Sequence, residues 1–346
     1  MIKLKSFTKC INPNTLLECY NQKKIQIITN NFVNKFIEAK PFDVTLRDGL
    51  QSLNYDEQKK ITYTKKIQIY QYLITKYNPY NLEIGSCINK KVSPIFEDTE
   101  YLFKYAEENK KKLNLSLHHY VLISNIKQLM NSLKFGATNF SFTTSLSNSF
   151  QYNHSMMTKH ENFTNLNNMM IILENLPSLK LTHTKTGNAS QDLNLQIYKV
   201  KLYLNCINEC PIEGKIPLDK IIGELYTLNK MKFDKICLYD TCGTLTHQDF
   251  LYILENAKKV GINIENLTLH LLVKPEREYE IEEIFHTALD YGINEFDVSD
   301  INTFGDSEDA DKYKNKDKNK NNYKDKITPN MSYEQYYKFL NNYLIK

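Results

Sequence analysis

The fold is decided by the stretch Lys235–His270, KICLYDTCGTLTHQDFLYILENAKKVGINIENLTLH, which holds one complete strand–helix–strand unit. Its apolar run Lys235–Tyr239 predicts a buried strand, and His247–Val260 has the apolar spacing that is typical of an amphipathic helix. A second strand is expected at Leu267–His270. Strands that alternate with helices in this way predict a parallel sheet with helices packed outside it.

The same alternation extends in both directions along the chain. The strands expected upstream are Phe42–Leu46, Asn81–Ile84, Leu115–Val121, Asn139–Phe142 and Val200–Asn205, and the helices among them are Asp56–Lys76, Glu97–Lys111, Ile123–Leu133, His160–Leu176 and Leu218–Met231. Downstream, the helix Glu276–Tyr291 and the strand Glu295–Val298 complete the series. About eight strands, each followed by a helix or its remnant, predict an α/β fold of the (β/α)8 TIM-barrel type. A doubly wound sheet would need a Gly-rich phosphate-binding turn after an early strand, and the sequence has none.

Composition divides the chain into four regions. They are an N-terminal extension at residues 1–40, a TIM-barrel domain at 41–305, a low-complexity charged insertion at 306–328 and a C-terminal helix at 329–346. Most of the insertion, Asp306–Lys326, offers almost nothing to bury, so we expect a solvated loop, with a lid over the site as the alternative. The polar segment Gly187–Asn194 is expected to be a loop as well. Helical periodicity returns at Met331–Ile345, so that helix is expected to dock on the barrel.

Composition and charge also exclude several classes of protein. The 346 residues include 44 Lys+Arg and 40 Asp+Glu, and a net charge of +4 is too small to indicate binding to nucleic acid or to a membrane surface. No apolar run is long enough to span a membrane. The seven cysteines are scattered and form no Cys-x-x-Cys pair, which argues against a disulfide framework and a structural zinc site. The N-terminal MIKLKSFTKC has no signal-peptide apolar run and is poor in the Arg and Ser of a mitochondrial transit peptide, so we expect a cytoplasmic protein.

Polar side chains at the ends of the predicted strands are the candidates for chemistry, because strand ends converge on the active site of a barrel. They are Arg47, Asp48, Gln51, Glu83, Asp240, Thr241 and His270. A carboxylate and an imidazole at strand ends can hold a divalent cation, and an arginine beside it can stabilise an enolate or a carbonyl oxyanion. Each residue also has a structural interpretation. Arg47 and Asp48 would form a salt bridge at the barrel rim, His270 would be a hydrogen-bonded core histidine, and Asp240 would cap a helix.

Several motifs resemble those of one family. The segment Pro41–Gln51, PFDVTLRDGLQ, resembles the first-strand signature of metal-dependent TIM-barrel lyases and Claisen-type synthases, the superfamily of 3-hydroxy-3-methylglutaryl-CoA (HMG-CoA) lyase, isopropylmalate synthase and homocitrate synthase. Leu50 favours the lyase branch, since the synthases usually carry Glu there. Further similar segments follow in order: LEIGSCINKKVSPIFEDTE, SNSFQYN, NCINECPIEGKIP and KICLYDTCGTLTHQDF. The resemblance to HMG-CoA lyases covers roughly residues 40–345.

The resemblance implies roles for individual residues. It makes Asp48, His270 and Asn330 ligands of Mg²⁺ or Mn²⁺, and Arg47 and Gln51 catalytic, with Arg47 stabilising the enolate. The residues that it places around the ligands and substrate are Glu83, Ser147, Asp240 and Thr241. Without the resemblance, Asn330 would be interpreted as a plain helix N-cap. The implied substrate is HMG-CoA or a similar 3-hydroxyacyl-CoA, cleaved to acetyl-CoA and a keto acid. Pairing of two copies into a homodimer is the implied option for assembly, with no nucleic-acid or membrane partner.

The chain also departs from the family pattern at two places. The family carries a second histidine two positions after the first, whereas His270 is followed by Leu271 and Leu272. The Gly-rich loop with the catalytic cysteine is not recognisable after Ser299, and no cysteine follows Cys242. A missing ligand weakens metal binding and a missing thiol removes an acid–base group. Three hypotheses therefore stay open: an active lyase, a catalytically degraded barrel acting as a binding or regulatory protein, and a Claisen-type synthase, which Leu50 disfavours.

Overall fold

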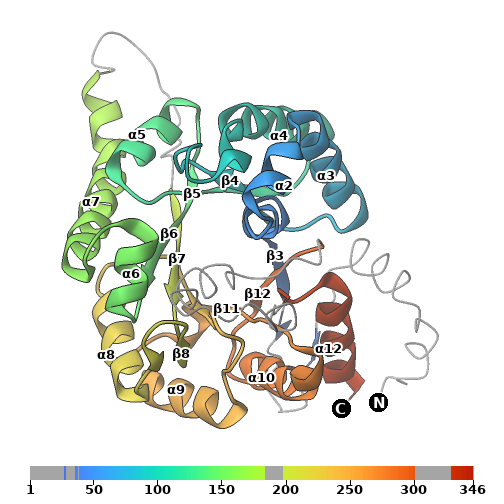
Figure 1. Cartoon of the computed structure of the whole chain (residues 1–346), viewed down its shortest axis with the longest axis vertical. Coiled ribbons are helices and arrows are strands. Elements are labelled where there is room, and N and C mark those ends of the chain that lie inside the picture. Colours follow the sequence, from blue (N-terminus) through green and yellow to red (C-terminus); the bar gives the residue numbers. More distant parts are fainter. Residues whose placement is uncertain (1–26, 29–35, 38, 184–197, 301–328, 346) are drawn as a thin grey trace, which may run out of the picture.

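A computed structural model describes residues 27–28, 36–37, 39–183, 198–300 and 329–345, and the segments expected to be loops at 187–194 and 306–326 lie outside these ranges. Eight parallel strands close into a barrel, which confirms the predicted TIM-barrel fold (Figure 1). In order around the barrel they are β3 (Lys40–Asp43), β4 (Asn81–Ser86), β5 (His118–Leu122), β6 (Asn139–Ser145), β7 (Lys199–Asn205), β10 (Lys235–Tyr239), β11 (Leu267–His270) and β12 (Glu295–Val298). β12 pairs back to β3 through Phe296 and Pro41, which closes the ring.

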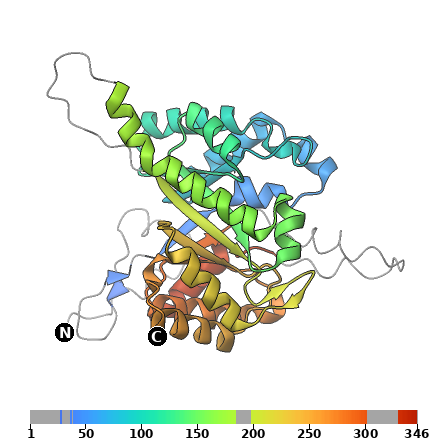
Figure 2. The same cartoon turned by 90° about the vertical axis from the view of Figure 1, so that its left-hand side faces the viewer.

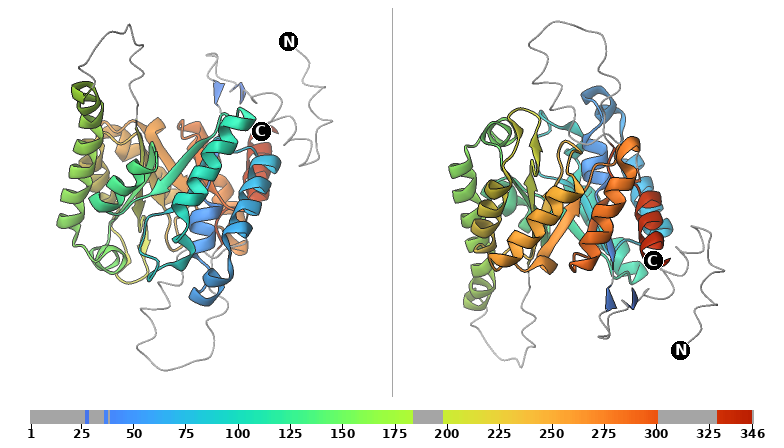
Figure 3. Two further views of the ribbon diagram at one scale, coloured as in Figure 1. Left: turned by 90° about the horizontal axis from the view of Figure 1, so that it is seen from above. Right: turned by 90° about the horizontal axis from the view of Figure 1, so that it is seen from below.

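Helices surround the barrel on its outside (Figure 3). They are α2 (Tyr55–Lys60), α3 (Tyr63–Lys76), α4 (Thr99–Leu113), α5 (Ile126–Lys134), α6 (Asn148–Ser155), α7 (Lys159–His183), α8 (Leu218–Asn229), α9 (His247–Lys259), α10 (Glu278–Asp290) and α12 (Tyr333–Ile345). The longest, α7, packs against β6 (Figure 2). Two short antiparallel pairs lie outside the barrel, β1 (Ile27–Ile28) with β2 (Phe36–Ile37) and β8 (Glu209–Cys210) with β9 (Gly214–Lys215). None of the described helices combines the length and apolar composition that a membrane crossing requires.

Two predicted elements differ from the structure near the start of the barrel. The predicted helix Asp56–Lys76 is two helices, because the Thr62 side chain accepts the backbone N–H of Lys65 and starts a new helix there. The predicted strand Phe42–Leu46 ends at Asp43, and a π-helical turn follows at Thr45–Gly49. Within this turn, the backbone N–H of Gly49 donates a hydrogen bond to the Val44 carbonyl at 3.0 Å. This turn rotates the backbone, so that two consecutive side chains of the first motif both face the barrel mouth.

The face of β7 that points into the barrel carries polar side chains. Val200, Leu202 and Leu204 pack outward among the core residues, and the alternate positions Lys201 and Tyr203 point into the barrel. Lys201 is buried, with its ammonium 3.5 Å from the centre of the Phe42 ring and paired to Glu295 and Asp297 of β12. The barrel is therefore held together inside by charge pairs as well as by apolar packing.

The C-terminal helix α12 docks on the barrel, as the sequence predicts. Phe339 and Tyr336 pack against Phe285 of α10, with ring centres 5.8 and 5.6 Å apart. Phe285 in turn stacks on Phe296 of β12 at 4.0 Å. The aromatic rings therefore link the last strand, the last barrel helix and the C-terminal helix in one buried cluster.

Truncation of this cluster should be costly for stability. Phe339 is fully buried, so Phe339→Ala is expected to lower the free energy of unfolding by about 3–5 kcal/mol, the usual cost of deleting a buried aromatic ring. The control is Tyr279→Ala on α10, a side chain that is 74% exposed, for which a change within about 0.5 kcal/mol is expected. Urea unfolding measures both values. Equal losses for the two variants would contradict docking of α12.

Candidate active site

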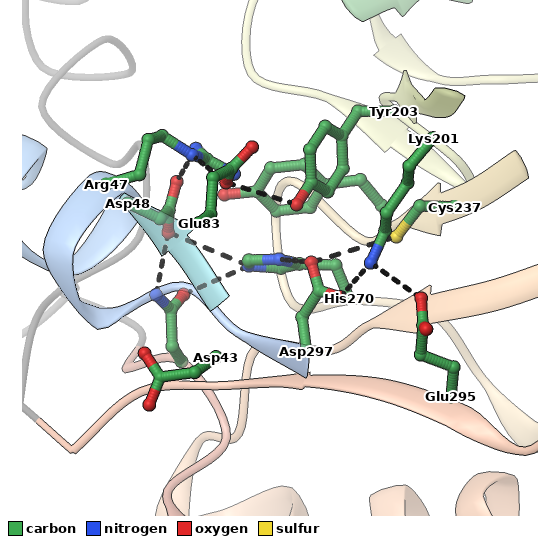
Figure 4. Close-up of polar contacts among 12 residues, drawn as sticks. Asp43, Arg47, Asp48, Glu83, Lys201, Tyr203, Cys237, His270, Glu295 and Asp297 are labelled. Atoms are coloured by element: carbon green, nitrogen blue, oxygen red, sulfur yellow. Dashed lines mark hydrogen bonds and ion pairs between the residues drawn. The ribbon is translucent and has the colours of Figure 1, made fainter. Parts of the chain in front are cut away.

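Arg47 is the central cation of the barrel mouth. Its Nε donates to Glu83 Oε2 of β4 at 2.5 Å, and its Nη1 donates to the Asp48 carboxylate (Figure 4). The Tyr203 ring of β7 lies 5.0 Å from the guanidinium carbon, and its hydroxyl donates to the same Glu83 oxygen at 3.3 Å. Burial alone would lower the pKa of Arg47, but the charges of Glu83 and Asp48 outweigh it and raise that pKa further. The guanidinium is therefore a permanent, fixed positive charge.

One edge of this arrangement is unsatisfied. Within the described residues, Arg47 Nη2 and Glu83 Oε1 are buried atoms that have no hydrogen-bond partner. A buried donor without a partner costs free energy, so such an atom marks a place where a ligand atom would be bound favourably. Arg47 also lines the pocket at the barrel mouth, which gives a ligand access to it.

Asp48, His270 and Asn330 converge beside Arg47. Asn330 donates from Nδ2 to Asp48 Oδ2 at 2.7 Å, its Oδ1 lies 3.1 Å from His270 Nε2, and His270 Nε2 lies 3.8 Å from Asp48 Oδ2. The structure thus brings together all three residues that the resemblance implies as metal ligands, from three distant parts of the chain. Asn330 is held here by a β-bridge to Leu272. It is not the N-cap of α12, because the Ser332 hydroxyl accepts the N–H of Gln335 instead.

The buried carboxylate of Asp297 fixes the orientation of His270. Its Nδ1 lies 3.0 Å from Asp297 Oδ2, and Asp297 also binds Lys201 Nζ at 2.5 Å. The Tyr239 ring packs on the imidazole, with ring centres 3.8 Å apart. Burial lowers the pKa of His270, but the hydrogen bond to Asp297 and the charge of Asp48 have the larger combined effect and raise it. Nε2 is therefore directed at Asp48 and Asn330.

The atoms that Asp48, His270 and Asn330 offer can be compared with the ligands that a divalent cation prefers. In the parts of the chain that the structure describes, no three His, Cys, Asp or Glu side chains gather where they could hold a metal ion. Asp48 and His270 are two such groups, the third donor is the Asn330 amide, and buried Leu272 adds none. One carboxylate oxygen, one amide oxygen and one imidazole nitrogen still suit a hard cation that keeps several waters.

The charged side chains around these three donors also favour binding of a cation. The buried cluster has four carboxylates, Asp48, Glu83, Glu295 and Asp297, facing two permanent cations, Arg47 and Lys201. This negative excess favours further positive charge, which a proton on His270 or a divalent cation can supply. The residues therefore fit a divalent cation held by three protein groups.

The pocket at the mouth is lined by two predicted catalytic residues and six others. Its lining is Arg47, Gln51, Leu122, Thr143, His154, Tyr203, Asn205 and Tyr239. Asn205 donates to Thr143 Oγ1 at 2.7 Å, so these two polar groups are held together on neighbouring strands. The sequence analysis did not identify either residue, although each lies near the end of a predicted strand. Asn205 also continues the every-second-residue series of Lys201 and Tyr203, whose side chains point into the barrel.

Three other predicted site residues bind backbone N–H groups in this structure, and none of them lines the pocket. The Ser147 hydroxyl accepts the N–H of Phe150 and caps α6. Asp240 accepts the N–H groups of Thr244 and Leu245, both at 3.0 Å, in the loop before α9. The N-cap of α9 is Thr246, so the interpretation of Asp240 as a helix cap is wrong. Burial raises the pKa of Asp240 to about 6. Thr241 Oγ1 accepts the N–H of Cys206 at 2.8 Å.

Comparison with known proteins supports the fold. No protein-family model and no curated protein matches the sequence. Among solved structures, an HMG-CoA lyase from Pseudomonas aeruginosa is 18% identical, with 89% of this chain and 86% of that chain covered and a TM-score of 0.65. An HMG-CoA lyase from Brucella melitensis is 14% identical over 88% and 90% of the chains, also at 0.65. One from Acinetobacter baumannii, in complex with coenzyme A and 3-methylmalate, is 18% identical over 88% and 84%, at 0.65. At these identities the likeness establishes a shared barrel fold.

A buried carboxyl next to the site should make stability depend on pH. Asp43, at the end of β3, accepts the Tyr333 hydroxyl of α12 at 2.7 Å, and burial raises its pKa from 3.8 to about 7. Its proton is kept in the folded chain but lost from the unfolded chain between about pH 4 and 7, so its contribution to stability falls as pH rises through that window. The full loss is up to about 4 kcal/mol.

The variant Asp43→Asn removes this titration. Its free energy of unfolding, measured in urea across the window, is expected to fall less with rising pH than that of the unmodified chain. The exposed Asp56→Asn is the matched control and should leave the pH profile unchanged. Parallel profiles for Asp43→Asn and the unmodified chain would show that Asp43 does not keep a proton in the folded state.

Proposed function

We propose that this chain is a divalent-metal-dependent carbon–carbon lyase, which cleaves HMG-CoA or a similar 3-hydroxyacyl-CoA to acetyl-CoA and a keto acid. The observation that carries the proposal is the unpaired, buried Nη2 of Arg47 at the pocket, next to the converging donors of Asp48, His270 and Asn330. Fold likeness to HMG-CoA lyases over most of the chain is further support.

The chemistry of such a cleavage requires a fixed positive charge. Breaking the bond between the second and third carbons leaves an enolate, whose charge lies largely on the thioester oxygen. Arg47 meets this need because Glu83 and Asp48 hold the guanidinium in place before substrate arrives, so little reorganisation is needed as charge develops. The free Nη2 is the atom that would donate to that oxygen.

The other residues position the reacting groups. Asp48, His270 and Asn330 would hold Mg²⁺ or Mn²⁺, which when bound supplies Lewis-acid polarisation of the substrate oxygens. Asp297 keeps His270 Nε2 directed at this point, and Gln51 offers an amide to the substrate from the pocket wall. Glu83 keeps Arg47 in place. Ser147, Asp240 and Thr241 would act on this site indirectly, through the start of α6 and the loop segments whose backbone N–H groups they bind.

The acyl-CoA substrate is part of the same proposal. A structural neighbour binds coenzyme A together with 3-methylmalate, and the pocket here offers one fixed cation and several neutral polar groups to an acyl portion of that kind. We propose a cytoplasmic enzyme that pairs as a homodimer.

One observation favours a second candidate, a barrel of the same descent that binds a ligand without catalysis. Leu272 is buried where the family carries its second metal histidine, and Asp48, His270 and Asn330 already satisfy one another by hydrogen bonds. A site of this kind would bind an acyl-CoA and leave it intact.

Turnover separates the two candidates. Purified chain with Mn²⁺ is expected to release acetyl-CoA from HMG-CoA or a shorter 3-hydroxyacyl-CoA, and Arg47→Lys should lower kcat by about 10²–10³, the cost of losing one oxyanion donor. Lysine keeps the charge but not the planar fork that binds Glu83 and Asp48 together. The control is Arg277→Lys, the other arginine of the chain, which binds the Gly243 and Leu245 carbonyls and should keep most of the activity. Thioester binding without turnover in every variant would favour the second candidate.

Metal binding can be measured without turnover. Mn²⁺ titration followed by electron paramagnetic resonance should show one site, and Asp48→Asn should weaken it at least about tenfold. Asp98→Asn removes the same charge from a distant pair with Lys66 and should leave Mn²⁺ affinity unchanged. Leu272→His should tighten the site, because it restores a donor near Asn330. Equal affinities for the unmodified chain and Asp48→Asn would exclude the proposed ligand set.

A further inference from the structure

Two cysteines that the proposed reaction does not use lie side by side beyond the end of β7. Cys206 directly follows Asn205, the last residue of that strand, and Cys210 lies four residues later in the β8–β9 hairpin. Both are buried free thiols. Their side chains hydrogen-bond to each other.

The backbone between them adopts an uncommon conformation. Cys206 has φ of 63° and Asn208 has φ of 74°, both in the left-handed region that non-glycine residues seldom occupy. The turn is fixed at both positions. The Cys206 N–H donates to Thr241 Oγ1 at 2.8 Å, and Asn208 Nδ2 donates to the Thr244 carbonyl at 2.7 Å. Strained backbone that is held this firmly is typical of functional positions.

The donors that reach the Cys210 sulfur from the described residues stabilise a thiolate. The backbone N–H groups of Ile212 and Glu213 both reach Sγ at 3.3 Å. The Cys206 thiol and the Ser147 hydroxyl also donate to it. The hydrogen bond from Cys206 is the largest influence and lowers the pKa of Cys210, whereas burial and the same hydrogen bond raise the pKa of Cys206. The two backbone N–H groups at Sγ therefore make Cys210 the member of the pair whose thiolate is better stabilised.

The other described thiols have the opposite character. Cys87 and Cys242 are more exposed than Cys210, yet burial raises the pKa of each to about 12. Cys237 is buried in the barrel interior, and its pKa is raised too. Because the thiolate is the reactive form of cysteine, ionisation and exposure predict different orders of reactivity in this chain. That difference makes the role of Cys210 testable.

We propose that Cys210 and Cys206 form a peroxide-oxidised pair, in which Cys210 is the reacting thiolate and Cys206 the resolving thiol, and that they close a disulfide at the mouth of the barrel. The proposal does not depend on the proposed lyase activity.

The chemistry balances with hydrogen peroxide as the oxidant. The Cys210 thiolate attacks one peroxide oxygen, the O–O bond breaks, and a sulfenic acid forms as hydroxide leaves and takes a proton to become water. The Cys206 sulfur then attacks the Cys210 sulfur, the S–O bond breaks, and the departing hydroxide takes the Cys206 proton to become a second water. Two thiols and one peroxide give one disulfide and two waters, with two electrons passing from sulfur to oxygen.

Access to Cys210 suits a small oxidant. The sulfur is covered by the hairpin segment that follows it, in which Ile212 is half-buried and Glu213 is exposed. Hydrogen peroxide is little larger than water and needs only local opening of this hairpin. A larger thiol reagent would be slowed at Cys210, so oxidation is the more direct test.

The ionisation step is measured first, on the full-length reduced chain. Ultraviolet thiolate absorbance should show a step below the titration range of ordinary cysteines. That step should be absent from Cys210→Ser and retained in Cys242→Ser, whose serine replaces a thiol of raised pKa. Loss of the step from neither variant, or from both, would overturn the assignment of the thiolate to Cys210.

Oxidation is then followed by graded hydrogen peroxide at neutral pH, alkylation of remaining thiols and peptide mass mapping. After cleavage at Glu209, two peptides joined through Cys206 and Cys210 are expected before Cys87, Cys237 or Cys242 is oxidised. In Cys206→Ser, a 1,3-dione reagent should instead capture sulfenic acid on Cys210. In Cys210→Ser, consumption of the first equivalent of peroxide should slow about tenfold, as an un-ionised thiol reacts through its small thiolate fraction. Earlier oxidation of Cys87 or Cys242 than of Cys210 would overturn the proposal.

Discussion

The buried guanidinium of Arg47 is the constraint on which the site depends. A charge taken out of water must be paired on most of its donors, and here the partners come from different elements: Glu83 from β4, Asp48 from the π-helical turn and Tyr203 from β7. The turn after β3 is what allows Arg47 and Asp48 to face the same point, because neighbouring residues of a strand would face opposite sides of the sheet. Nη2 is left without a partner among the described residues, and Arg47 is one of the residues that line the pocket.

From Asp48 a chain of polar contacts crosses the barrel. It runs through Asn330 and His270 to Asp297 of β12, reaches Lys201 of β7, and returns from Lys201 to Glu295 of β12. Each charged group in this chain is buried and has a partner of the opposite sign or a hydrogen bond. The chain also joins the segment before α12 to the barrel, so docking of the C-terminal helix and assembly of the site depend on each other. Substitutions in that helix are therefore expected to reach the site through Asn330.

Much of this arrangement follows from the sequence, and the rest has identifiable physical reasons. Strand–helix alternation predicts the barrel, and a barrel requires that Arg47, Glu83 and His270 meet at one end. The pairing of Lys201 with Asp297 could not be predicted, because period-two alternation gives the face of each strand but not the register in which a closed barrel aligns them. Propensity does not reveal the π-helical turn after Asp43 either. The helix break at Thr62 was readable as a cap, but the continuous apolar pattern on both sides concealed it.

Anomalous diffraction from crystals grown with Mn²⁺ would show whether the three converging donors bind a metal ion. We expect one strong manganese peak bound by Asp48, His270 Nε2 and Asn330 Oδ1, beside the guanidinium of Arg47, with the remaining ligands supplied by water. No peak at this position under saturating Mn²⁺, or a peak held by other residues, would contradict this expectation. The barrel mouth would then be a binding site for an anionic ligand of Arg47 alone.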